Sequence, residues 1–437
     1  MAASDAPQDS TEVVEPTETT EEFSESSKEV KVDTCIEIAA DDEEEVDDST
    51  KITVSVVTWN LAEASPSEDE AQFLRQFRKA HPSLSSQDGR KGSDIVLIGG
   101  QETEDIKPRR AEGNRSRELR RLVIKMLGRD YVPIAIHSLG GVQFCLCVRR
   151  EILGEIELCS VADVTCGIGN VFHNKGAICA YVQMKARNKK ENSDGEEEES
   201  STTKRQKSVK MLFVAAHMAA HVKNVDARNE DFWRIASELE AQAPPRFLRP
   251  RSPREQALED AENGGGSHLM DSMDHVFFCG DLNYRIDLPR EITEYTVMQI
   301  EECLQQGNER EADKLRLSLL RHDQLSRVMS EGAAFPGFAE GKITFPPTFK
   351  FDKGTKSYDT SHKQRVPAFT DRILFKPFGV RVLEYRSEVD ATHSDHRPVT
   401  GTFLVDIEGK KLPEQSRRQK PKRRSRRKKS RPEVDQY

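Results

Sequence analysis

Short apolar segments rich in β-branched residues recur along residues 51–407, and this recurrence constrains the fold more than any other feature of the chain. Runs of this length and composition are typical of β-strands. The expected strands cover residues 51–61, 94–102, 131–149, 175–184, 210–218, 274–283, 372–376, 380–389 and 398–407. Helical periodicity lies between them, in residues 71–80, 116–127, 229–242 and 291–330. Many strands with short links and interspersed helices predict an α/β sandwich of mixed sheets rather than one doubly wound parallel sheet.

The two ends of the chain carry opposite charge. Residues 1–50 contain 18 acidic residues and two lysines, whereas residues 409–437 contain 13 basic residues and three acidic ones. Segments this polar cannot bury enough apolar surface to fold alone. We therefore expect a disordered acidic N-terminal segment over 1–50, a folded domain over 51–408, and a disordered polybasic tail over 409–437.

Two polar stretches interrupt the expected domain. Residues 187–208 join two apolar strands and contain no hydrophobic residue, and residues 244–272 contain the sequences PPRFLRPRSPR and GGGS. Long polar connections run over protein surfaces, so both stretches are expected to be surface insertions.

The cysteines and the hydropathy of the chain indicate its compartment. Most of the eight cysteines sit inside apolar runs, and no CxxC pair is present. This usage predicts reduced core cysteines rather than a disulfide framework or a zinc site. No apolar stretch approaches the roughly 18 residues that a membrane helix needs, and the N-terminus does not resemble a signal peptide. We expect a soluble, cytoplasmic protein with no transmembrane segment.

Carboxylate, amide and imidazole side chains stand where several expected strands begin or end. The set is Asn60, Glu102, His217, Asp281, Asn283, Asp371, Asp395 and His396. Asp281 and Asn283 are two residues apart, so they project to the same side of a strand. Each residue alone is more often a turn or structural residue, but in a sandwich the strand ends can converge on one rim. A carboxylate such as Glu102, with waters and a substrate phosphate, is a typical arrangement for Mg²⁺.

Two longer motifs carry a resemblance to a known family: GDLNYR at 280–285 and RVPAFTDRIL at 365–374. Shorter motifs support them in order: WNLA at 59–62, QE at 101–102, NKGAI at 174–178, HMAAHVKNVDARNEDF at 217–232, PPTFKFD at 346–352 and SDHRP at 394–398. The chain resembles the inositol polyphosphate 5-phosphatases of the endonuclease/exonuclease/phosphatase superfamily, over about residues 52–407. The resemblance implies a four-layer α/β sandwich of two mixed, mostly antiparallel β-sheets flanked by helices.

The resemblance also implies which residues bind the metal and activate water. Glu102 would be the principal Mg²⁺ ligand, assisted by Asn60 and Asp395, and the ion would stabilise the charge that grows on the phosphate. Asp281 would orient and deprotonate the attacking water. Asn283 would fix that water or a phosphoryl oxygen.

The remaining catalytic roles fall to a buried acid and two imidazoles. Asp371 would pair with His396, keep the ring oriented and raise its pKa. A cationic His396 would then bind the phosphate, and His217 would bind the scissile phosphate as well.

Substrate choice is expected to depend on cations. Lys350, Lys363 and Arg365 match the family positions that bind the inositol 4-phosphate, and Asn174 and Lys175 belong to a loop near the scissile group. Arginine suits bidentate phosphate contacts and lysine supplies a point charge. Unlike many lipid-acting members, the chain has a phenylalanine rather than a tyrosine before Lys350, which leaves the substrate ranking open.

The resulting prediction is a Mg²⁺-dependent 5-phosphatase acting on phosphatidylinositol 4,5-bisphosphate and the 3,4,5-trisphosphate. One alternative is a soluble enzyme that acts on inositol 1,4,5-trisphosphate. A second is a metal-dependent endonuclease on the same fold, although the 365–374 motif and the lysines suit a multiply phosphorylated ring better than nucleic acid. A third is an inactive phosphoinositide-binding protein.

The polybasic tail suggests a second partner. Clustered Lys and Arg are attracted to anionic lipid by roughly 1 kcal/mol per residue near the surface. We therefore expect peripheral membrane association through residues 409–437. A nuclear-localisation or nucleic-acid-binding patch, and a latch against the acidic N-terminus, remain alternatives.

Overall fold

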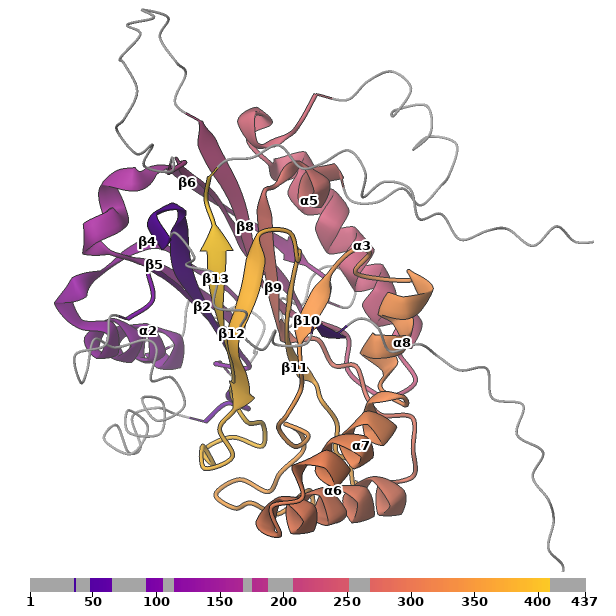
Figure 1. Ribbon diagram of the computed structural model, residues 1–437. Helices are drawn as coiled ribbons and strands as arrows, with labels where there is room; N and C mark the ends of the chain where they lie inside the picture. The colour runs from indigo at the N-terminus through magenta and orange to yellow at the C-terminus, as the bar shows by residue number, and fades with distance from the viewer. Residues whose placement is uncertain are drawn as a thin grey trace, which may run out of the picture. The chain divides into compact units, whose positions relative to one another are not determined.

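The computed structural model describes residues 35–36, 48–64, 92–104, 114–167, 175–187, 207–250 and 268–408. All of these residues belong to one unit of the chain, residues 32–437. Two β-sheets make up the centre of this unit (Figure 1). Within the described residues, no helix is both long enough and apolar enough to cross a membrane.

The larger sheet has seven strands in the order β1, β10, β11, β9, β8, β7, β6. The bounds in that order are Cys35–Ile36, Ala339–Gly341, Asp371–Phe375, His275–Asp281, Ser208–His217, Gly176–Lys185 and Ile156–Thr165. The pairs β1–β10 and β8–β9 are parallel, and the other four pairs are antiparallel.

The smaller sheet has six strands in the order β12, β13, β2, β3, β5, β4. Their bounds in that order are Val380–Ser387, Val399–Asp406, Lys51–Asn60, Ile95–Gln101, Val142–Arg149 and Tyr131–Leu139. Among the described strands of this sheet, only β2 and β3 pair in parallel. Both sheets are therefore mixed and mostly antiparallel, which confirms the fold class predicted from the sequence.

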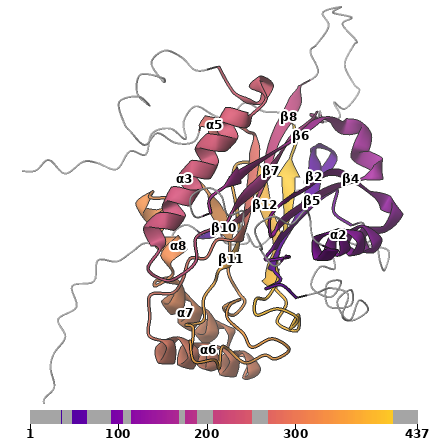
Figure 2. The same cartoon turned by 180° about the vertical axis from the view of Figure 1, so that it is seen from behind.

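Helices cover the outer face of each sheet, and together they give four layers. The described α-helices are α2 (Asn114–Leu127), α3 (Val225–Gln242), α5 (His268–Ser272), α6 (Arg290–Gln305), α7 (Glu309–Leu320) and α8 (Gln324–Glu331). Short 3-10 turns are η1 (Asp48–Thr50), η3 (Gly128–Asp130), η4 (Arg150–Glu155) and η6 (Pro245–Phe247). Helix α2 packs on the six-stranded sheet, and α3, α5 and α8 pack on the seven-stranded sheet. Figure 2 shows α2 and α3 on opposite sides of the strands.

The main core lies between the two sheets. Alternate residues of β2, β3, β5, β7, β8, β9, β11 and β13 fill it, as period-two alternation of strand side chains requires. Within one sheet the Phe277 ring stacks on the Phe213 ring, with a centroid distance of 5.6 Å. Phe277 also contacts Phe403 of the other sheet, with a centroid distance of 5.1 Å. Burial of this much apolar surface fixes how the sheets face each other.

Each sheet contains a central parallel pair, and the carboxyl ends of those pairs carry the polar residues identified from the sequence. In the β2–β3 pair Asn60 lies opposite Gln101, and in the β8–β9 pair His217 lies opposite Asp281. Parallel strands place their carboxyl ends at the same edge of a sheet. This topology gives both sheets a polar edge.

Two short stretches before the expected domain boundary at residue 51 also form secondary structure. Cys35–Ile36 forms β1, paired with β10, and residues 48–50 form a turn whose Thr50 carbonyl accepts a hydrogen bond from the Ile407 amide at 2.8 Å. Backbone pairing orders these stretches despite the acidic composition around them. Residues 1–34 and 37–47 and the tail 409–437 lie outside the described residues.

The ends of the two expected insertions lie within the described residues. Phe247 and Leu269 are fully buried, so the described ends of 244–272 pack into the core beneath α3 rather than lying on the surface. Ser208 begins β8, and Arg187 pairs with Glu155 at 2.9 Å, which shortens the insertion 187–208. Residues 188–206 and 251–267, and the helix expected over 71–80, lie outside the described residues.

Candidate active site

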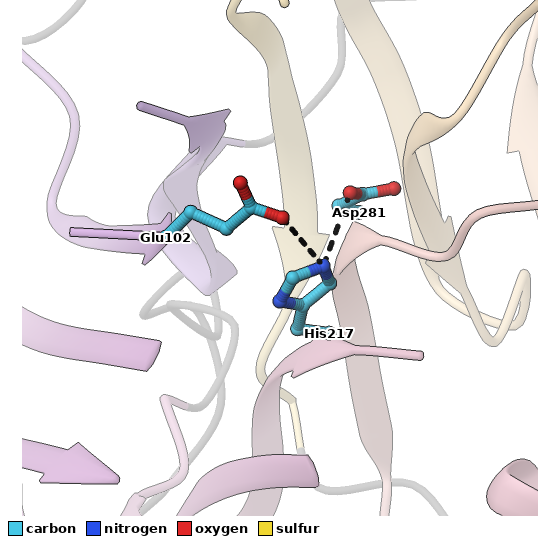
Figure 3. A group of neighbouring side chains, drawn as sticks. All are labelled: Glu102, His217 and Asp281. Carbon is cyan, nitrogen blue, oxygen red and sulfur yellow. Dashed lines mark ion pairs between the residues drawn. The ribbon is translucent and has the colours of Figure 1, made fainter. Parts of the chain in front are cut away.

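The polar ends of the two parallel strand pairs meet at one place. Glu102 follows β3, His217 ends β8 and Asp281 ends β9, and the three side chains point toward one another (Figure 3). His217 Nε2 lies 3.3 Å from Asp281 Oδ2 and 3.6 Å from Glu102 Oε1. One ligand atom from each residue lies within 4.8 Å of the other two. The two sheets thus contribute to a single site.

Gly280 explains how an acid can directly follow a buried apolar strand. Its φ is +149°, and a Cβ atom built on it would lie 1.9 Å from the Ala216 carbonyl oxygen. Only glycine allows β9 to approach β8 this closely at the strand end. The glycine therefore sets the position of Asp281 beside His217.

Asp281 is buried and held by hydrogen bonds. Its Oδ2 accepts from Asn60 Nδ2 at 2.9 Å, and its Oδ1 accepts from the Asn283 backbone amide at 3.1 Å. Burial disfavours its charged form, but the hydrogen bond with His217 and the nearby positive charges of His396 and Lys175 outweigh burial and hold the pKa of Asp281 well below its usual range. Asp281 is therefore an ionised acceptor.

Asp371 and His396 form a second polar pair beside Asp281. Asp371, the first residue of β11, lies opposite Asp281 in the sheet, and its Oδ2 accepts from His396 Nδ1 at 2.9 Å. The hydroxyls of Thr348 and Thr370 donate to the same oxygen at 2.7 and 2.9 Å. Burial disfavours the imidazolium, but Asp371 and then Asp281 and Asp395 outweigh burial and raise the pKa of His396 to about 9. His396 is therefore cationic at neutral pH.

Asn283 has its orientation fixed by a residue that the sequence analysis did not single out. Asn283 has a φ of +59°, which asparagine tolerates better than most residues. Its Oδ1 accepts from Arg285 Nη2 at 2.5 Å, and its Nδ2 donates to the Met218 carbonyl at 3.1 Å. The Arg285 guanidinium also lies 4.3 Å over the Phe349 ring. Arg285 belongs to the GDLNYR motif, which was the available signal for it.

Lys350 and Asp395 form an ion pair at the edge of the site. Lys350 Nζ lies 3.1 Å from Asp395 Oδ2. The other oxygen, Oδ1, is buried without a hydrogen-bond partner and lies 4.0 Å from His396 Nε2. Asp395 is thus placed next to the site but outside the clusters around Asp281, so its role as a ligand stays a prediction.

Positive charge gathers around His221, in the loop after β8. Lys175 Nζ contacts His217 Nε2 directly. Burial first, and then the charges of neighbouring cations, lowers the pKa of His221; the cations are Arg365, Arg285, Lys175 and Lys363. The backbone amide of Arg365 donates to Asp359 Oδ2 at 2.9 Å, which orders the loop that carries Lys363 and Arg365. These cations give the surface beside the Asp281 cluster a positive potential, which attracts anions.

The donor set fits a divalent cation. Carboxylate oxygens of Glu102 and Asp281 converge on one point, and the buried Oδ1 of Asp395 has no hydrogen-bond partner. The Asn60 amide oxygen accepts from the Ala62 amide at 2.9 Å and retains a second lone pair. Oxygen donors of this kind suit Mg²⁺ or Ca²⁺.

A model of endonuclease/exonuclease/phosphatase family 2 matches residues 57–402. The chain belongs to this family. The match runs from within β2 to within β13 and includes every residue of the polar cluster.

The curated relatives of the chain within this family include 5-phosphatases. The chain is 31% identical over 325 residues to inositol-1,4,5-trisphosphate 5-phosphatase 1 of Schizosaccharomyces pombe, covering 72% of this chain and 24% of that protein. It is 27% identical over 364 residues to the phosphatidylinositol 4,5-bisphosphate 5-phosphatase INP51 of Saccharomyces cerevisiae, covering 82% of this chain and 32% of that protein. The chain thus spans no more than about a third of the length of these relatives.

A solved structure agrees with these relatives. The inositol polyphosphate 5-phosphatase domain of SpSynaptojanin, in complex with inositol (1,4)-bisphosphate and a calcium ion, is 27% identical, with a TM-score of 0.57. The match covers 82% of this chain and 86% of that chain. The resemblance to the inositol polyphosphate 5-phosphatases is confirmed.

The structure brings most of the predicted site residues together. Those that meet around Asp281 are Asn60, Glu102, His217, Asn283, Asp371 and His396. Lys175 joins them through His217, and Asp395 and Lys350 lie at the edge. Asn174 lies outside the described residues. The individual catalytic and binding roles stay predictions.

Proposed function

We propose that this domain is a Mg²⁺-dependent phosphomonoesterase that removes the 5-phosphate from phosphoinositides, including phosphatidylinositol 4,5-bisphosphate and the 3,4,5-trisphosphate. The observation that carries the proposal is the meeting of the ionised Asp281 with Glu102 on one side and the cationic His396 on the other. Such a site has an acceptor for water, a donor set for a metal and a positive charge for phosphate.

The names of the relatives support the substrate class. They specify 5-phosphatases that act on inositol 1,4,5-trisphosphate and on phosphatidylinositol 4,5-bisphosphate. The solved neighbour contains inositol (1,4)-bisphosphate, which is inositol 1,4,5-trisphosphate without its 5-phosphate. Extending these chemistries to this chain is part of the proposal.

Glu102, with Asn60 and Asp395, would hold the metal. When bound, the ion neutralises phosphate charge and acts as a Lewis acid toward its oxygens. Asp281 accepts a hydrogen bond from the attacking water and takes its proton as the water oxygen bonds to phosphorus. Asn60 Nδ2, 2.9 Å from Asp281 Oδ2, keeps that carboxylate aimed. The ring 5-oxygen leaves as the P–O bond breaks and takes a proton from solvent water, and Asp281 returns its own proton to solvent when the products leave.

The other polar groups hold the phosphoryl group during transfer. His396, kept charged by Asp371, offers Nε2 to a phosphoryl oxygen. Arg285 takes one lone pair of the Asn283 oxygen and the Met218 carbonyl takes one N–H of its NH₂ group, so the second N–H can donate to a phosphoryl oxygen. Burial and then Lys175 lower the pKa of His217, so His217 contributes as a neutral ring. Fixed donors around developing charge are the main source of catalysis in such sites.

Selectivity for the ring is assigned to the cations at the edge of the site. Lys350, Lys363 and Arg365 would bind the 4-phosphate, and Lys175, with Asn174, would bind near the scissile group. Lys350 is partly exposed and lies next to Asp395, so a phosphate can reach it from solvent.

The test is phosphate release in Mg²⁺ from a short-chain phosphatidylinositol 4,5-bisphosphate and from inositol 1,4,5-trisphosphate. Asp281→Ala should lower the rate by about 10²–10⁴-fold, and a chelator should abolish release. Asp226→Ala, an exposed acid in the first turn of α3, serves as the matched control and should keep the wild-type rate. Equal rates for wild type and Asp281→Ala would reject the assigned site.

The soluble substrate is the second candidate, and the name of the Schizosaccharomyces relative favours it. Comparable kcat/KM for the free head group and the lipid would support it, whereas a strong preference for lipid would support the first proposal. Cleavage of plasmid DNA with no phosphate release from either substrate would instead indicate an endonuclease.

We also propose that residues 409–437 attract the enzyme to the cytoplasmic, anionic face of a membrane. The 13 basic residues of this tail support the idea. Deleting residues 410–437 should slow hydrolysis on phosphatidylserine vesicles at low salt and spare a short-chain substrate. A uniform loss on both substrates would mean that the tail supports folding instead.

A further inference from the structure

Gln324, the first residue of α8, uses every hydrogen-bonding position of its side chain. Its Oε1 accepts from Arg228 Nη2 at 2.6 Å and from the Arg285 backbone amide at 3.0 Å. Its Nε2 donates to Asp287 Oδ1 at 2.6 Å and to the Val222 carbonyl at 3.1 Å. A glutamine amide has two lone pairs and two N–H groups, so the side chain is saturated. Only 2% of it is exposed.

Two of these bonds lead to the loop that follows β8. Arg228, on α3, donates to the carbonyls of Ala219 and His221 at 3.2 and 2.7 Å and to that of Val222 at 3.3 Å. Gln324 holds the guanidinium and also binds the Val222 carbonyl itself. The conformation of this loop, including the left-handed His221 (φ +76°), therefore depends on Gln324.

The other two bonds lead to the loop that follows β9. Gln324 holds the Arg285 amide and the Asp287 carboxylate, and the Arg285 side chain donates to the Asn283 carbonyl at 3.1 Å and to Asn283 Oδ1 at 2.5 Å. The Asn283 amide is thus set between Arg285 on one side and the Met218 carbonyl on the other. Both supports of that amide lie in the loops that Gln324 joins.

Gln324 is itself anchored to the sheet. The preceding residue, Asp323, caps α8 by accepting from the Ser326 amide at 2.9 Å. The same Asp323 oxygen accepts from Arg372 Nη1 at 2.9 Å, and Arg372 directly follows Asp371 in β11. These contacts therefore fix the start of α8, including Gln324, relative to β11, the strand that begins with Asp371.

We propose that Gln324 is a positioning residue for this site: it joins the β8 and β9 loops so that the Asn283 NH₂ group is presented to the phosphoryl group. Gln324 does not touch the reacting atoms and acts through Arg285 and Arg228. The kinetic part of this inference rests on the proposed phosphatase function.

The first test is Gln324→Leu, which keeps the volume and removes all four hydrogen bonds. Asn283 stabilises charge that grows in the transition state, so kcat should fall by about 10–100-fold while KM changes little. Val328→Ala is the matched control, because the Val328 side chain is buried in the apolar core on the same helix. It should lower Tm and keep kcat.

A second test exchanges donor and acceptor. Gln324→Glu keeps an acceptor for Arg228 and Arg285 but places a second carboxylate next to Asp287. The repulsion between the two carboxylates should make kcat low at neutral pH. As the pH falls, the two acids share a proton and kcat should recover. Adding Asp287→Asn restores a donor opposite the new carboxylate and should recover much of kcat at neutral pH. A residue with a merely structural role would show neither the pH dependence nor the rescue.

A third readout does not need activity. The side-chain amide resonance of Asn283, assigned by its loss in Asn283→Asp, should shift in Gln324→Leu and stay unchanged in Val328→Ala. An unshifted Asn283 resonance, or equal loss of kcat in Gln324→Leu and Val328→Ala, would overturn the inference. If the wild type releases no phosphate from any inositol substrate, the proposed function fails, but the Asn283 resonance still decides the positioning role.

Discussion

The Lys350 ammonium lies 3.1 Å from the Asp395 carboxylate, so a residue assigned to the substrate neutralises a residue assigned to the metal. A substrate phosphate competes with Asp395 for the Lys350 ammonium, and a metal ion competes with Lys350 for the Asp395 carboxylate. Binding of either one breaks the ion pair and frees the partner that the other needs. Substrate and metal should therefore bind more tightly together than separately.

Lys350→Met tests this coupling by removing the competing cation. The substitution should tighten Mg²⁺ binding to the substrate-free protein by about two- to fivefold, as expected for a partly exposed ion pair, while raising KM for 4-phosphorylated substrates. Isothermal titration with Mg²⁺ measures the first effect. Lys353→Met, on a neighbouring exposed stretch, controls for the loss of any positive charge, and equal tightening in both variants would rule out a specific role for the Lys350–Asp395 pair.

The charge of His396 should depend on Asp371. In the folded protein burial opposes the imidazolium, but Asp371 and two further carboxylates raise the pKa of His396 to about 9. The pair therefore adds to the free energy of unfolding. This contribution is fully present below the ordinary histidine pKa of about 6.5 and is lost as the pH rises through about 9. Asp371→Asn should lower the pKa of His396 to about 6.5 or below. Imidazole NMR titration of chelator-treated protein measures the change, and a pKa that stays near 9 would show that Asp371 is not its cause.

Gly280 should tolerate no side chain. Gly280→Ala would place a Cβ 1.9 Å from the Ala216 carbonyl oxygen, and relieving that contact must separate β9 from β8. We expect a loss of about 3 kcal/mol in the free energy of unfolding and a loss of activity, since Asp281 moves with the strand. Gly332 follows α8 with a φ of +70°, and a Cβ added to it would have no neighbouring atom within 4 Å. Gly332→Ala should therefore lower the free energy of unfolding by only about 1 kcal/mol. Urea unfolding compares the two, and similar costs would contradict the close approach.

Arg372 should be important for stability. It pairs with Asp323 at 2.9 Å and with Glu340 at 2.5 Å, and all three side chains are buried. Arg372→Met would leave two buried carboxylates without their partner and should cost about 3–5 kcal/mol. Lys314→Met, which breaks the exposed pair with Glu311, should cost less than about 1 kcal/mol. Thermal or urea unfolding measures both, and a cost for Arg372→Met no larger than that for Lys314→Met would contradict the importance of the buried ion pairs.

The central strands could be predicted because their apolar alternation is strong and fully buried. The strand β6 was missed because Ile156–Thr165 lies at an edge and most of its side chains are partly exposed, so the apolar signal is weak. The strands β1 and β10 are too short, at two and three residues, for any periodicity. Phe247 and Leu269 were assigned to a surface insertion because polar neighbours hide single buried residues in a composition-based argument.

The site could be predicted where the residue type itself carries chemistry. Asp281, Glu102 and His396 stand out as acids and an imidazole at strand ends, and the structure brings them together. Gln324 could not be found this way, because a glutamine in a helix has no distinctive pattern and its four partners come from two segments distant in sequence, 222–228 and 285–287. The Lys350–Asp395 pair was likewise invisible, since 45 residues of sequence separate two side chains that the fold brings into contact.

The identity of the product tests the central claim most directly. Wild-type protein should be incubated in Mg²⁺ with inositol 1,4,5-trisphosphate and with phosphatidylinositol 4,5-bisphosphate, and each product identified by chromatography against isomeric standards. The account predicts inositol 1,4-bisphosphate and phosphatidylinositol 4-phosphate, formed about 10²–10⁴-fold more slowly by Asp281→Ala. Loss of the 4-phosphate instead, or intact substrates after incubation with folded wild-type protein, would contradict it.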